Sequence, residues 1–173
     1  MYLTLIIVHM IGTILGTGGA TMIEILLAKA LKDGVVDPLE SDFLRATYRV
    51  VRVGLLLSVF SGFGFLLLYE FSGQTARLYN PVLWAKLTII LIILANALLL
   101  QARKINLFWG SAFSFVSWWT AVLLGILLTN GSYALSYPSI MFYYLIAVFL
   151  GAGILEACRD ALQKYFEQHE RSS

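Results

Sequence analysis

The sequence predicts an all-α protein, a polytopic membrane helix bundle with five transmembrane helices in a single integral membrane domain over residues 1–173. Of its residues, 60% are apolar and 13% are charged, and the mean hydropathy is +0.83, which exceeds that of soluble domains. A water-soluble enzyme is therefore excluded. The net charge of +2 gives no indication of a nucleic-acid partner, and the single cysteine, Cys158, excludes a disulfide framework.

Three blocks without any charged residue define most of the organisation: residues 1–23, 53–69 and 105–155. A helix needs about 20 mainly apolar residues to cross the hydrocarbon layer, so the last block holds two spans, divided by the turn signal Asn130-Gly131-Ser132. Another span begins at Pro81, a residue that suits the first helical turn. The expected spans cover residues 3–29, 50–70, 81–101, 107–129 and 138–158, and a cytoplasmic tail follows over residues 159–173, finishing as helix.

The ends of the first loop carry helix signals of their own. Span one is expected to stop at a glycine, Gly34. Asp37, Pro38 and Glu40 follow the pattern of a capping box, so an interfacial helix should lead into span two. Arg45, Arg49 and Arg52 fall on one stripe of that helix, which is expected to face lipid headgroups.

Lys and Arg residues are divided unequally between the two sides of the predicted bundle. Of the 12, ten flank the first loop, the third loop or the tail, and only Arg77 and Lys86 belong to the other side. Because positively charged segments remain in the cytoplasm, we expect the amino terminus outside and the carboxyl terminus inside. His9 and Lys86 would then share the outer leaflet.

His9 is one of the few polar side chains expected inside the membrane, about two turns from the outer end of span one. Gly12 and Gly16 share its helical face. One interpretation is close helix packing through these glycines, with His9 hydrogen-bonded to a neighbouring carbonyl. The other is that a neutral imidazole binds heme iron, while the glycines make room for the macrocycle.

Lys86 is expected about a turn and a half into span three, in the same leaflet as His9. Its ammonium either extends to the headgroups or neutralises a heme propionate beside His9. Asn96 is expected to make an interhelical hydrogen bond in preference to binding a ligand. Trp118 and Trp119 either pack in the core or line a cofactor cavity. The candidate cofactor contacts are thus His9, Gly12, Gly16, Lys86, Asn96, Trp118 and Trp119, with His9 as the metal ligand.

Glu24 lies near the inner end of span one, some four turns from His9, so the two cannot share a coordination shell. A carboxylate at this depth requires a cation. We expect a structural ion pair with Arg49 or Arg52, and a role in proton relay or ion binding is the alternative.

Short motifs resemble the CopD-like superfamily of small bacterial integral membrane proteins over roughly residues 5–125. They are His9-x-x-Gly12, Gly16-x-Gly18-Gly19-Ala20, Ser61-Gly62-x-Gly64, and Ala85-Lys86-Leu87 followed by Asn96. The chain is most similar to an uncharacterised five-span branch, and more distantly to the HemJ-type protoporphyrinogen oxidases. That resemblance implies a multi-pass protein of the bacterial inner membrane that binds heme b, with His9 as axial ligand and Lys86 as the matching lysine. The oxidases carry a further histidine where this chain has Asn96.

Three classes of function are left open. The first is a heme b protein with an electron-transfer or oxidase-like role. The second is a non-enzymatic scaffold or accessory subunit, whose glycine-rich helix faces bind a second copy or another membrane protein. The third is a small-solute or metal permease using His9, Glu24 and Asn96, which would need a continuous polar path through apolar residues.

Overall fold

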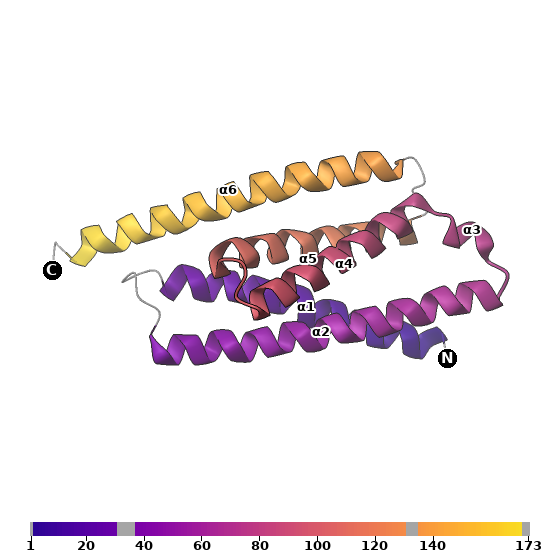
Figure 1. The fold of residues 1–173 in the computed structure, drawn as a ribbon, viewed down its shortest axis with the longest axis horizontal. Coiled ribbons are helices and arrows are strands. Elements are labelled where there is room, and N and C mark those ends of the chain that lie inside the picture. Colours follow the sequence, from indigo (N-terminus) through magenta and orange to yellow (C-terminus); the bar gives the residue numbers. More distant parts are fainter. Residues whose placement is uncertain (1, 31–36, 131–134, 171–173) are drawn as a thin grey trace.

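The computed structural model describes residues 2–30, 37–130 and 135–170, and every element in them is helical (Figure 1). The expected stops and turns at Gly34 and Gly131 lie outside these residues. The helices are α1 (Tyr2–Ala30), α2 (Pro38–Phe71), α3 (Thr75–Leu78), α4 (Pro81–Gln101), α5 (Leu107–Thr129) and α6 (Tyr137–Glu170). All but α3 are long and apolar enough to cross a membrane, which confirms an all-α protein with five candidate spans.

The long helices run alongside one another, so that the two chain ends lie at opposite ends of the bundle (Figure 1). The amino terminus lies at the end that carries α3, called here the α3 end, and the α1–α2 and α4–α5 connections lie at the opposite end. α1 packs most extensively on α2, α4 packs on α5, and α6 packs on α5 and α4. Helices α1 and α5 also pack against each other.

The predicted bounds of spans three and four, residues 81–101 and 107–129, are those of α4 and α5. Side-chain caps explain this agreement, because the Asn80 side chain accepts from the Val82 amide at 2.9 Å and Asn106 accepts from Phe108 at 3.0 Å. Each cap satisfies an amide that the first helical turn leaves unpaired.

α2 and α6 extend beyond the predicted spans. Helix α2 begins at the predicted capping box, where the Asp37 amide donates to the Glu40 carboxylate at 3.1 Å. The interfacial helix is thus continuous with span two. The polar tail is helical through Glu170, as expected.

Glycines permit α1 and α2 to cross at backbone contact. A Cβ atom on Gly12 would lie 2.9 Å from the Gly54 carbonyl oxygen, and one on Gly54 would lie 2.8 Å from the Gly12 oxygen. No side chain fits at such distances. The close-packing interpretation of Gly12 is therefore confirmed, because Gly12 is covered by α2 of the same chain.

Outward faces of the bundle are apolar. Phe60, Leu91 and Phe149 are 70%, 65% and 77% exposed, whereas Leu27, Ile89 and Ile93 are buried between the helices. In a soluble protein so many exposed large apolar side chains would form an aggregating surface. On this chain they meet the acyl chains of the bilayer.

Candidate functional site

The α3 half of the bundle holds a polar cluster made of one residue from each of three helices: His9 on α1, Ser61 on α2 and Lys86 on α4. The His9 Nδ1 atom lies 2.9 Å from the Ser61 hydroxyl oxygen, and the Lys86 ammonium lies 3.4 Å from His9 Nε2. Ser61 and Lys86 lie 52 and 77 positions further along the chain than His9, and the fold brings them to its two ring nitrogens. We call these three residues the His9 cluster.

The hydrogen bonds of Ser61 assign the proton on the imidazole. Its hydroxyl donates to the Leu57 carbonyl oxygen at 2.5 Å, so the hydroxyl oxygen accepts from the other side. The His9 Nδ1–H is therefore the donor to Ser61, and Nε2 carries a lone pair. Lys86 donates to that lone pair over a long hydrogen bond.

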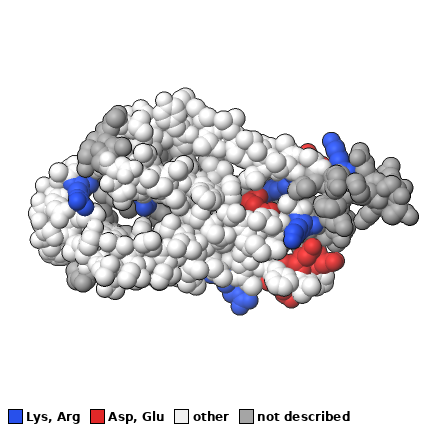
Figure 2. Space-filling model, turned by 180° about the vertical axis from the view of Figure 1, so that it is seen from behind, with Lys and Arg blue, Asp and Glu red and all other residues white. Residues whose placement is uncertain are grey.

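The Lys86 ammonium packs closely against α5. A Cβ atom on Gly125 would lie 3.1 Å from the Lys86 ammonium, so Gly125 provides the space for it. Figure 2 shows that the surface of this half is hollowed, with Lys or Arg side chains at the hollow. Among the described residues, Arg77 and Lys86 are the basic residues of the α3 half of the bundle (Figure 1). Arg77 packs 5.3 Å from the Tyr69 ring centroid.

The glycines on the His9 face do not provide such space. Gly12 packs against Gly54 and Ser58, and Gly16 packs against the six-membered ring of Trp118. Trp118 is only 1% exposed and fills the gap between α1 and α5. The expectation that Gly12 and Gly16 make room for a macrocycle is therefore wrong, because neighbouring helices occupy that groove.

Trp119 and Asn96 do not join the His9 cluster. Trp119 is 45% exposed, and its indole nitrogen donates to Thr21 at 3.2 Å, a residue about 18 Å from His9 along α1. Trp118 and Trp119 point about 100° apart on one helix, so they do not line one cavity. The Asn96 amide donates to the Gly110 carbonyl oxygen at 2.8 Å, which confirms the interhelical hydrogen bond.

Glu24 forms a buried ion pair, but its partner is Arg159 of α6. The prediction of Arg49 or Arg52 is wrong, since Arg49 is exposed and the Arg52 guanidinium lies 4.8 Å from the Tyr48 ring centroid. Arg159 also donates to the Ser111 hydroxyl at 3.3 Å. The pair joins α1, α5 and α6 in the half away from the His9 cluster.

The sequence contains a signal for Arg159 that was missed. Tyr144, Val148 and Ala152 are buried and recur every four residues along α6. Continuing this stripe by seven residues, or two helical turns, reaches Arg159. The position thus belongs to the face that packs against the bundle, even though it lies in the polar tail.

Within the residues that the structure describes, no group of three or more His, Cys, Asp or Glu side chains gathers to hold a metal ion. A cofactor metal at the His9 cluster would thus have one protein nitrogen as its ligand. This fits a heme iron, because the macrocycle supplies most of the iron's ligands.

The fold defines the class of the chain: it is an integral membrane protein with five spans, in contact with the lipid bilayer. Comparison with protein families, curated proteins and solved structures finds no match to the chain.

Proposed function

We propose that this chain is a heme b-binding protein with an electron-transfer or oxidase-like role, in which His9 Nε2 would hold the iron. The observation that carries the proposal is the hydrogen bond from His9 Nδ1 to Ser61. It leaves the imidazole neutral, with a lone pair on Nε2 that the Lys86 ammonium contacts in the structure and that iron would take in its place. Ligating histidines characteristically donate their other ring N–H to such a partner.

Lys86 supports the same assignment. Its ammonium lies beside the nitrogen that would bind iron, where it places a positive charge for an anionic substituent such as a heme propionate. Heme supplies one-electron chemistry when bound. His9 and Lys86 would hold it, Ser61 would orient the imidazole, and the filled glycine face of α1 would take no part.

The resemblance to the CopD-like superfamily belongs to this proposal, and it rests on motifs that contain the same residues, His9, Ser61 and Lys86. It also supports a location in the bacterial inner membrane, and the distribution of Lys and Arg supports the amino terminus outside. The engaged amide of Asn96 lies about 15 Å from Lys86 along α4. The proposal therefore includes a single protein ligand.

A permease is less well supported, because the α1 face between His9 and Glu24 is closed. Gly12 and Gly16 are packed against α2 and Trp118 there, and Ala20 is buried. A scaffold that binds a partner through the same glycines is also less well supported, because these glycines are already packed against α2 and Trp118.

Titration of the purified protein with hemin, followed by the Soret band, tests the proposal. We expect saturable binding that is lost in His9→Ala and weakened in Lys86→Ala. His169→Ala is the matched control, because it removes the only other histidine and lies beyond the fifth span. Equal binding by wild type and His9→Ala, with both proteins monodisperse, would overturn the assignment.

A further inference from the structure

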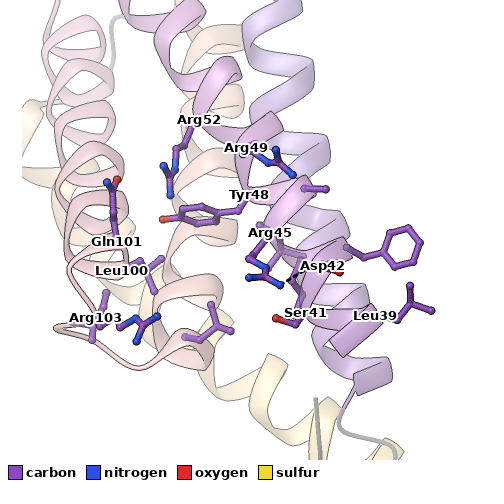
Figure 3. A pocket seen from close by; sticks show the side chains of 16 residues that line it. Leu39, Ser41, Asp42, Arg45, Tyr48, Arg49, Arg52, Leu100, Gln101 and Arg103 are labelled. Carbon is purple, nitrogen blue, oxygen red and sulfur yellow. Dashed lines mark hydrogen bonds and ion pairs between the residues drawn. The ribbon is translucent and has the colours of Figure 1, made fainter. Parts of the chain in front are cut away.

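A second polar site lies at the opposite end of the bundle from the His9 cluster. It is an open pocket of about 1250 Å³ between α2 and the α4–α5 connection (Figure 3). Four arginines line it, Arg45, Arg49 and Arg52 from α2 and Arg103 from the connection, together with one acidic residue, Asp42. We call this the arginine pocket.

The positive charge of the pocket is largely uncompensated. Asp42 pairs with Arg45 at 2.5 Å. Arg52 stacks on Tyr48, whose hydroxyl in turn donates to the Ala97 carbonyl oxygen at 3.2 Å. Neither Arg49, Arg52 nor Arg103 has a carboxylate partner among residues 2–30, 37–130 and 135–170. Figure 3 shows Arg52 and Tyr48 reaching from α2 into the space that Arg103 and Gln101 border from the other side.

Arg103 occupies a backbone position that usually belongs to glycine. Its φ of +53° is left-handed. The amides of Arg103 and Lys104 donate back to the carbonyl oxygens of Leu100 and Leu99, at 3.1 and 3.0 Å, as in a Schellman motif that ends a helix. An arginine there is strained relative to glycine, and strained residues concentrate at binding sites.

The rest of the pocket wall is mainly apolar, which suits the part of a lipid where the polar headgroup joins the apolar acyl chains. Leu39, Phe43, Leu44, Leu100 and Leu107 contribute to it. Leu39 and Phe43 are themselves 67% and 55% exposed, so the pocket continues into the lipid-facing surface. A soluble phosphate compound would gain nothing from these side chains, whereas a phospholipid would bury its glycerol and upper acyl carbons against them.

We propose that the arginine pocket binds the headgroup of an anionic phospholipid, with Arg49, Arg52 and Arg103 supplying the positive charge around its phosphate. Planar guanidinium groups suit phosphate oxygens because they donate two parallel hydrogen bonds. The site is independent of the proposed heme. It goes beyond the general attraction of basic loops to the membrane because these three arginines line a defined cavity.

The test is lipid binding by the full-length protein, delipidated in a nonionic detergent and titrated with dioleoyl phosphatidylglycerol, with adducts counted by native mass spectrometry. We expect saturable binding that phosphatidylcholine does not reproduce. Arg103→Gly should weaken it about fivefold, since a basic residue near a membrane surface contributes on the order of 1 kcal/mol. The double variant Arg49→Ala/Arg52→Ala should weaken it about 25-fold by the same arithmetic.

Lys104→Ala is the matched control, because Lys104 adjoins Arg103 in the same turn and does not line the pocket. Arg103→Gly should not lower the melting temperature, because glycine relieves the left-handed backbone, so weaker binding would not reflect misfolding. Equal losses in Lys104→Ala and Arg103→Gly would overturn the proposal, as would equal binding of phosphatidylcholine. Displacement of the lipid by equimolar inorganic phosphate would show a soluble ligand instead and would also overturn it.

Discussion

Trp118 of α5 fills the space that Gly16 leaves on α1. A Cβ atom on Gly16 would overlap the indole ring, whereas one on Gly18, two residues further, would meet nothing within 4 Å. The same residue type thus has different roles at two neighbouring positions. Gly16 permits α1 and α5 to approach, and Gly18 faces outward.

This difference predicts opposite effects of one substitution. Gly16→Ala should destabilise the protein by about 1–3 kcal/mol, the usual range for overpacking, because the rigid indole cannot move aside. Gly18→Ala should be neutral or stabilising by up to about 1 kcal/mol through helix propensity. Unfolding in detergent with increasing SDS measures both. Equal effects of the two substitutions would show that Trp118 does not pack on Gly16.

Loss of one member of the buried pair Glu24–Arg159 should be costly. Arg159→Met leaves Glu24 buried without its cation, and we expect a loss of about 3–5 kcal/mol in the free energy of unfolding. The double variant Glu24→Leu/Arg159→Met should recover much of this, because no charge is left in the interior. The exposed ion pair Asp42–Arg45 offers the control. Arg45→Ala should lower the free energy of unfolding by at most about 1 kcal/mol. A double variant as unstable as the single one would argue against the pair.

Ser61 should act on heme binding through His9. Ser61→Ala removes the acceptor for the Nδ1–H, so the imidazole loses its fixed orientation. We expect hemin affinity to fall about tenfold or more, as for other partners of ligating histidines. Ser58→Ala is the control, since Ser58 is buried with no hydrogen-bond partner for its hydroxyl in the described part of the chain. Unchanged hemin affinity in Ser61→Ala would remove the main support for His9 as ligand.

Asn96 should matter for stability alone. Asn96→Leu removes the hydrogen bond to Gly110 between α4 and α5, and membrane hydrogen bonds of this kind contribute about 0.6–1.7 kcal/mol. Hemin affinity should stay the same, because Asn96 lies far from His9 along the bundle. A variant that unfolds normally but no longer binds hemin would show that Asn96 belongs to the site.

Local signals in the sequence predicted the helices well. Pro81 marks a helix start that the structure places at that residue, because such signals depend on neighbours along the chain. The four-residue helix α3 was not predicted, since a segment as short as Thr75–Leu78 carries no periodicity. Its position is set by the tight turn at Gly73, whose φ is +68°.

Contacts between helices were harder to predict. The depth of Glu24 correctly indicated a need for a cation, yet the choice among arginines depends on which helix lies beside α1. His9 and Lys86 were expected in one leaflet, and the structure brings them into contact. The role of Ser61 required knowing that α2 crosses α1 at Gly54.

The heme content of the protein purified from cells grown with ample heme supply tests the central claim most directly. The pyridine hemochrome assay, compared with protein concentration, should give about one heme b per chain in wild type and in His169→Ala, and none in His9→Ala. A colourless wild type, folded and monodisperse, would contradict the claim and return His9 to a role in helix packing.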